Sequence, residues 1–321
     1  MTDESWPMIE EAVFRLFDDV AAEHVAIGPR LTELGWADIE SEYPVEACEL
    51  LFRAQGRSLA HTDCLDRVMV AELAAVLAES ANAVVLPTLP DGCTPGSQPD
   101  QVTGIVLGPP QGRVVVPVAG PMGDVSVAVV DADSLDQRRL PTFDPSVHWT
   151  FVSGPLEARL VDASVEWHRA FAAAHRALAT ELVSVTTQML HIAVEHAKSR
   201  VQFGAPIGSF QSLRHALAEA SAAVEGARAL LDESWRYGGH LLALTAKAAA
   251  GRAHRTVADT TLQTCAAIGL TDEHNLHRYV SRGFQIDSLC GDYQRIETFV
   301  AEQLSNARQP SQGLPTLVVC G

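Results

Sequence analysis

The second half of the chain carries a long helical pattern of apolar residues. From Ser164 onward, large apolar side chains recur at steps of three, four and seven, at Trp167, Phe171, Leu178, Leu182, Val185, Met189 and Ile192. This spacing predicts one apolar stripe on a helix of roughly 35 residues. Similar patterns predict helices at 209–235, at 240–267 before Gly269, and at 291–307. Long helices with short joins predict an up-and-down four-helix bundle.

The first part of the chain predicts shorter helices. Residues 5–27 show a helical apolar face, and Gly28-Pro29 is expected to stop that helix. A second helix is expected from Pro44 to Gly56, and a third at 65–81. Together they predict an N-terminal helical domain at 1–82.

Between the two helical parts, residues 83–163 lose the helical period and are rich in proline and glycine. Short runs typical of strands occur at 83–86, 103–107, 113–117, 125–130 and 158–161. The sequence therefore predicts a mainly α protein with a small, reduced β domain at 83–163. The helical bundle is expected at 164–308, and 309–321 is interpreted as a peripheral tail.

Composition argues against several classes of partner and site. The 321 residues carry a net charge of −17 and no basic run, which argues against a nucleic-acid partner. An anionic ligand would need local cations and backbone amides. Six scattered cysteines without a CxxC pair, and an N-terminus unlike a signal peptide, indicate a reduced, cytoplasmic protein. No apolar run reaches the ~20 residues of a membrane span, so no membrane partner is expected. The pair His274 and His277 lacks a third ligand, so no metal site is predicted.

The join between the first two bundle helices contains the most distinctive motif. It reads Arg200-x-Gln202-Phe203-Gly204-x-Pro206-Ile207, followed by Phe210 and Gln211. A cation, two amides and an aromatic ring at a helix–turn–helix corner suit a planar, phosphorylated ligand. The segment resembles the RxQFGxPIxxFQ hallmark of the acyl-CoA dehydrogenase family. Leu31–Trp36 (LTELGW) also resembles the family's turn after the first helix.

A second segment, Gln263–Thr271, resembles the family's Q-x-x-G-G-x-G-x-T phrase, and Glu273 follows it. In the family, such segments contact FAD that is bound in a neighbouring subunit. The resemblance implies that Arg200 pairs with the pyrophosphate, while Gln202, Phe203 and Gln211 line the adenosine side. The site would be closed by Gln263, Thr264, Cys265, Ala266 and Ala267, with alanines at 266 and 267 where glycines are usual.

The resemblance also implies a missing catalytic base. The family removes the α-proton of an acyl-CoA with a glutamate, because a thioester α-proton is only weakly acidic. The two usual positions of that glutamate are Cys290 and Ala174 in this chain. Catalytic residues are therefore predicted to be none, although Cys290, Asp292 and His175 stay open as unusual bases. Trp149-Thr150 resembles the family's flavin-packing phrase, and packing between domains is the other interpretation of Trp149.

These features predict the shortened subunit of a heteromeric, α2β2-type acyl-CoA dehydrogenase. Its partner would be a longer dehydrogenase subunit that supplies the glutamate and binds most of the acyl-CoA. The resemblance implies steroid-derived or other bulky acyl groups as the substrate class. This chain would complete the FAD site across the interface. The alternatives are a self-sufficient homo-oligomeric dehydrogenase with an unusual base, and a flavin-free structural homologue.

Overall fold

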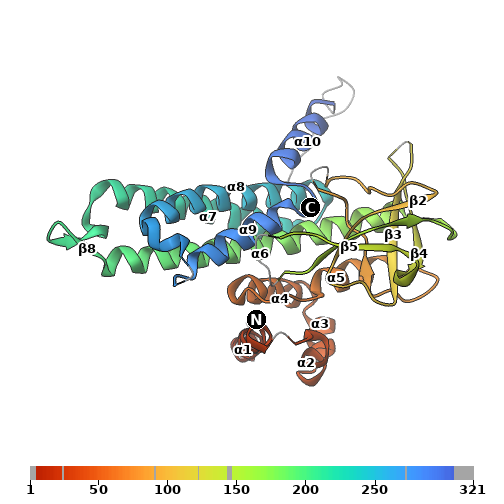
Figure 1. Ribbon diagram of the computed structural model, residues 1–321, viewed down its shortest axis with the longest axis horizontal. Helices are drawn as coiled ribbons and strands as arrows, with labels where there is room; N and C mark the ends of the chain where they lie inside the picture. Colours follow the sequence, from red (N-terminus) through yellow and green to blue (C-terminus); the bar gives the residue numbers. More distant parts are fainter. Residues whose placement is uncertain are drawn as a thin grey trace.

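The computed structural model describes residues 5–23, 25–89, 92–121, 123–142, 147–271 and 273–306. Helices occupy both ends of this part of the chain and two small sheets lie between them, so the predicted mainly α architecture is confirmed (Figure 1). The domain boundaries stay a prediction. The predicted tail at 309–321 lies outside the described residues.

The N-terminal region has more helices than the sequence predicted. The elements are α1 (Trp6–Glu23), α2 (Ile27–Glu33), α3 (Trp36–Glu42), α4 (Pro44–Ser58) and α5 (Cys64–Leu73). The prediction that Gly28-Pro29 stops a helix was wrong, because both residues lie in the first turn of α2. Proline is tolerated there, since the first N–H groups of a helix have no partner inside it.

Gly56 was expected to end a helix, but α4 continues to Ser58 and Gly56 is buried where α4 crosses the long helix α6 (Ser164–Ser199). A Cβ at Gly56 would lie 2.6 Å from the Glu181 carbonyl oxygen and 2.8 Å from Ser184 Cβ. The missing side chain therefore allows the two helices to approach closely and brings Gln55 next to Glu181.

Two sheets form the middle of the protein. One has the order β1 (Ala83–Val84), β3 (Arg113–Ala119), β4 (Val125–Asp131) and β7 (Val161–Asp162). The other has the order β2 (Gln101–Leu107), β6 (Trp149–Pro155) and β5 (Asp136–Arg139). Their buried faces share an apolar core that includes Val102, Val106, Val114, Val116 and Val152.

Four of the five predicted strand runs are found, but the run at 158–161 was wrong except for Val161. The sequence did not reveal β5 or β6. The four residues of β5 are all exposed and polar, so they show no apolar alternation. The run in β6 ends in Gly154-Pro155, which reads as a break.

The bundle consists of α6, α7 (Gln211–Tyr237), α8 (His240–Cys265) and α9 (Leu276–Ser288), with α10 (Tyr293–Asn306) packed on α8. Helices α6 and α7 are joined by the hairpin of β8 (Val201–Gln202) and β9 (Ala205–Pro206), at the left end of Figure 1. Among the described residues, α6 alone is long and apolar enough to span a membrane by length and composition. It packs against α4, α5, α7, α8 and α9, which explains its apolar surface.

The sequence Thr271-Asp272-Glu273 predicts the cap of a short helix, and this prediction was wrong. Helix α9 begins only at Leu276, after Asn275, and the Thr271 hydroxyl donates to the Ile268 carbonyl oxygen at 2.8 Å. Asp272 lies outside the described residues. The preceding helix α8 ends at Cys265, and residues Ala266–Leu270 form a 3₁₀ turn.

Candidate functional site

The β8–β9 hairpin presents the first motif at the end of the bundle. Its two-residue loop, Phe203-Gly204, has φ values of 55° and 80°, the left-handed backbone that tight hairpin turns require. Glycine adopts this conformation freely, but a bulky residue seldom does. Phe203 is nevertheless 95% exposed, at 6.2 Å from the Phe210 ring and edge-on to it. An aromatic residue with a strained backbone and its side chain in solvent indicates a contact outside this chain.

The polar residues of the motif are exposed beside Phe203. Arg200 follows the last residue of α6, and within the described part of the chain its guanidinium makes no hydrogen bond or ion pair. Gln202 is also exposed, and its side-chain amide donates to the carbonyl oxygen of Val201, at 2.8 Å. Gln211 is the exposed first residue of α7. An uncommitted guanidinium next to amides and an aromatic ring fits a pyrophosphate with a planar base, such as FAD.

The structure brings the second motif to the same end of the bundle. His196, one turn before Arg200, and Cys265, in the middle of Gln263–Ala267, have side-chain donor atoms within 4.8 Å of each other. Gln263, Ala266 and Ala267 are exposed there. Cys265 and Thr264 are 2% and 6% exposed, so neither side chain is open to a ligand in this chain.

The backbone conformation of Ala266 is one that glycine adopts more easily than alanine. It has φ 54° and ψ −144°, a region that is essentially restricted to glycine. The alanine is therefore strained, and the backbone conformation that a glycine would adopt freely is kept.

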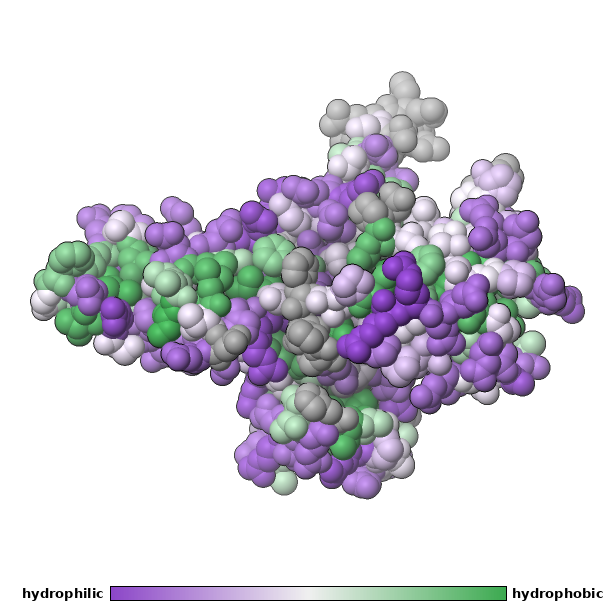
Figure 2. Space-filling view, in the orientation of Figure 1, coloured by the Kyte–Doolittle hydropathy of each residue, from purple (hydrophilic) through white to green (hydrophobic). Residues whose placement is uncertain are grey.

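Apolar side chains surround both motifs. Val201, Phe203, Phe210, Ile268 and Leu270 are between 39% and 95% exposed. Figure 2 shows hydrophobic residues gathered around the hairpin end of the bundle. Exposed apolar residues that gather around a free cation mark an interaction surface.

The two positions where the catalytic base was expected are buried. Ala174 is 0% exposed, and Cys290 is 1% exposed. The Nε2 of His175 donates to the Cys290 carbonyl oxygen at 2.9 Å. Burial raises the pKa of the Cys290 thiol to about 12, whereas burial and the Lys247 charge lower the pKa of His175 to about 3. Neither group would accept a proton from a thioester at neutral pH.

Asp292 has a structural contact instead. Its carboxylate accepts the Arg295 backbone N–H at 2.9 Å and thus caps the start of α10. This contact gives the Asp292 carboxylate a structural role at the start of α10.

A cavity of about 460 Å³ lies between the N-terminal helices, the sheets and the bundle. Trp149, His61, Asp66, Glu181 and Arg282 are among its lining residues. Trp149 is 7% exposed and belongs to the apolar core shared with α6, which is a packing role between domains.

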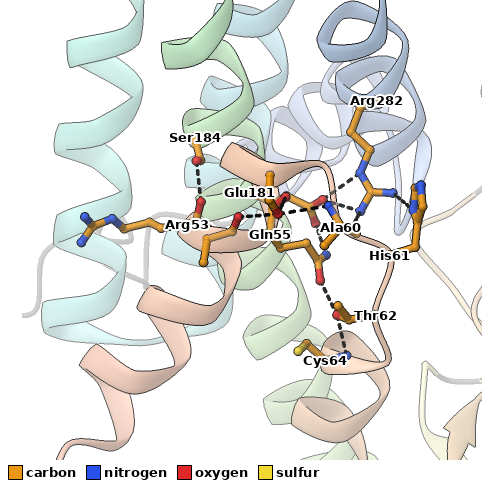
Figure 3. A network of polar contacts seen from close by, with 11 residues as sticks. Arg53, Gln55, Ala60, His61, Thr62, Cys64, Glu181, Ser184 and Arg282 are labelled. Carbon is orange, nitrogen blue, oxygen red and sulfur yellow. Dashed lines mark hydrogen bonds and ion pairs between the residues drawn. The ribbon is translucent and has the colours of Figure 1, made fainter. Parts of the chain in front are cut away.

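A buried ion pair lies at the wall of this cavity (Figure 3). Arg282 Nε donates to Glu181 Oε1 at 2.9 Å, and Nη2 bonds the same oxygen. Gln55 donates to the other Glu181 oxygen at 2.8 Å, and Arg282 Nη1 bonds His61 Nδ1 at 2.8 Å. Sequence reasoning missed this network. Its only signal is a charged residue, Glu181, between the buried positions Leu178 and Leu182 of the apolar stripe.

Asp66 on the same cavity predicts a pH dependence. Burial raises its pKa to about 7, although its carboxylate accepts the Val84 N–H at 2.8 Å. The folded state therefore binds a proton more tightly than the unfolded chain, so the stabilising contribution is full below about pH 4 and is lost as pH rises through about 7. Asp66→Asn keeps the acceptor without the charge. We expect the free energy of unfolding of Asp66→Asn, measured with urea, to rise relative to that of the wild type by about 2–3 kcal/mol from pH 5 to pH 8. An advantage that does not change with pH would contradict the raised pKa.

Comparisons with known proteins agree with this fold. Residues 167–289 match the family described as acyl-CoA dehydrogenase, C-terminal domain. Acyl-CoA dehydrogenase IpdE2 of Mycobacterium tuberculosis is 40% identical over 105 residues, which cover 33% of this chain and 33% of that protein. Acyl-CoA dehydrogenase FadE34 of the same organism is 32% identical over 199 residues, which cover 58% of this chain and 27% of FadE34. The matches thus span a third or less of the length of these two relatives.

Solved structures extend the likeness to nearly the whole chain. A variant of the Tcur3481-Tcur3483 steroid ACAD superposes with a TM-score of 0.78 at 22% identity, covering 94% of this chain and 98% of that one. The ChsE4-ChsE5 complex of Mycobacterium tuberculosis gives a TM-score of 0.75 at 20% identity, covering 97% and 99%. Residues 167–289 are thus similar to the C-terminal domain of acyl-CoA dehydrogenases, and the described part of the chain has the acyl-CoA dehydrogenase fold.

Proposed function

We propose that this chain is the non-catalytic subunit of a heteromeric, FAD-dependent acyl-CoA dehydrogenase. One contrast carries the proposal: the cofactor motif faces outward, whereas the usual base positions are buried and hold no carboxylate. A longer partner subunit supplies the glutamate and binds most of the acyl-CoA, and this chain completes the FAD site across the interface. None of the five cysteines in the described residues forms a disulfide, in keeping with the cytoplasm as the proposed location.

The residues of this chain bind and orient the cofactor. The Arg200 guanidinium would hold the pyrophosphate, while Gln202, Phe203 and Gln211 would line the adenosine. The segment from Gln263 to Ala267, in which Gln263, Ala266 and Ala267 are exposed, would close the site. When bound, FAD supplies the acceptor for the hydride that leaves the β-carbon of the acyl group. The surrounding apolar residues would exclude water once the partner covers them.

The names of the similar proteins support the heteromer and the substrate class. One solved neighbour is named as the ChsE4-ChsE5 complex, and another as the Tcur3481-Tcur3483 steroid ACAD. On that basis we propose an α2β2 assembly that acts on a bulky, steroid-derived acyl-CoA.

Flavin absorbance tests the proposal. The chain is purified alone and after co-expression with longer dehydrogenases that carry the glutamate. We expect flavin only in a mixed complex, because each chain contributes part of the site. Stoichiometric flavin in the lone chain would favour a self-sufficient homo-oligomer. A stable mixed complex that lacks flavin would favour a flavin-free structural homologue.

A further inference from the structure

Three side chains with metal-binding atoms meet where α6 and α8 end. They are His196 in the last turn of α6, Cys265 at the end of α8, and His274 in the loop before α9. One donor atom from each lies within 4.8 Å of the other two. The two histidine rings are edge-on to each other at 6.1 Å, and Cys265 is 2% exposed. Within the described residues, neither the His196 ring nor the Cys265 thiol has a hydrogen-bond partner.

We propose that His196, Cys265 and His274 bind a Zn²⁺ ion. Two imidazoles and a thiolate are a donor set that zinc prefers, and a water molecule can take the fourth position. Bond lengths of about 2.0–2.3 Å place tetrahedral ligand atoms roughly 3.4–3.6 Å apart. The three donor atoms must therefore approach by about 1 Å, which small side-chain rotations of the half-exposed histidines provide. The thiol releases its proton when the metal binds, because the thiolate is the ligand.

The contacts that coordination would displace are weak. The Leu276 N–H donates to His274 Nδ1 at 3.3 Å, which is a long hydrogen bond. It would be lost whichever ring nitrogen of His274 binds the metal, because Nδ1 would then carry either the metal or the ring proton. His277, which the sequence pairs with His274, is not part of the cluster; its Nδ1 lies 2.8 Å from the His274 carbonyl oxygen.

The site would fasten three segments that the sequence separates. His196 lies one turn before Arg200, and Cys265 precedes the strained Ala266. A bound ion would link these helix ends to the loop before α9 and hold the outward-facing motifs in place. This inference does not rest on the proposed function, since it concerns metal binding by the chain itself.

Cobalt provides the test, because a cobalt–thiolate bond gives a charge-transfer band in the near ultraviolet that imidazole ligands alone do not give. The full-length chain, alone or in its complex, is treated with a chelator and titrated with Co²⁺. We expect the band to saturate at one ion per chain and to disappear when Zn²⁺ is added. Cys265→Ser should remove the band, and His196→Ala or His274→Ala should weaken Co²⁺ binding by at least about tenfold.

Matched controls use residues of the same type outside the cluster. His191→Ala changes an exposed histidine of α6, and Cys48→Ser changes a free cysteine of α4; both should bind Co²⁺ as the wild type does. Co²⁺ binding without a thiolate band, or a band that persists in Cys265→Ser, would overturn the proposal. If Cys265→Ser does not fold, unchanged affinity in both histidine variants would overturn it equally.

Discussion

Replacing Arg282 with methionine is expected to lower the free energy of unfolding by about 3–5 kcal/mol. Arg282 and Glu181 are 8% and 2% exposed, so the substitution leaves a carboxylate buried without its cation. The same change removes the donors to His61 and to the Ala60 carbonyl oxygen. Gln55 alone would then remain on Glu181. Urea unfolding of the two proteins at neutral pH measures the difference.

An exposed ion pair is the matched control. Arg169 and Glu72 also join a bundle helix to an N-terminal helix, but their side chains are 63% and 33% exposed. Arg169→Met should change stability by less than about 1 kcal/mol, because solvent screens an exposed pair. The double variant Glu181→Leu with Arg282→Met should recover much of the loss, since no charge stays buried. An Arg282→Met protein as stable as Arg169→Met would show that the buried pair is not needed for stability.

The long helices could be predicted from sequence because each repeats its apolar face over many turns. The steps from Trp167 to Ile192 fit one helix, and α6 follows them closely. The predictions of short elements were wrong where they depended on a single residue. Gly56 reads as a helix end, yet it is a close-approach position against α6 that only the crossing partner reveals.

The candidate site was predictable where its chemistry is contiguous. The residues from Arg200 to Gln211 are contiguous, so the motif that they form can be recognised from the sequence alone. The buried network could not be predicted, because Arg282 lies 101 residues from Glu181 and 221 from His61. The same holds for Cys265 and His196, which meet only because α6 and α8 end together.

Replacing Arg200 with alanine should strip FAD from the proposed complex. A planar guanidinium can donate two parallel hydrogen bonds to a pyrophosphate, and hydrogen bonds to charged groups contribute about 1.5–3 kcal/mol each. We therefore expect FAD affinity to fall by at least roughly 100-fold, so that the purified complex is nearly colourless. Arg200 is exposed and makes no ion pair within the described residues, so thermal unfolding of the lone chain should be unchanged. This separates a binding defect from a folding defect.

Lys198→Ala is the control for general electrostatics at the same end of the bundle. Lys198 is also an exposed cation, but its ammonium group is paired with Glu195 at 2.7 Å. Flavin content should stay near that of the wild type in this variant. Arg200→Lys should hold an intermediate amount, because an ammonium keeps the charge but loses the two-bond geometry. If Arg200→Ala kept its full flavin, or if Lys198→Ala lost as much, the pyrophosphate contact would belong to another residue. The outward-facing hairpin would then serve the subunit interface rather than the cofactor.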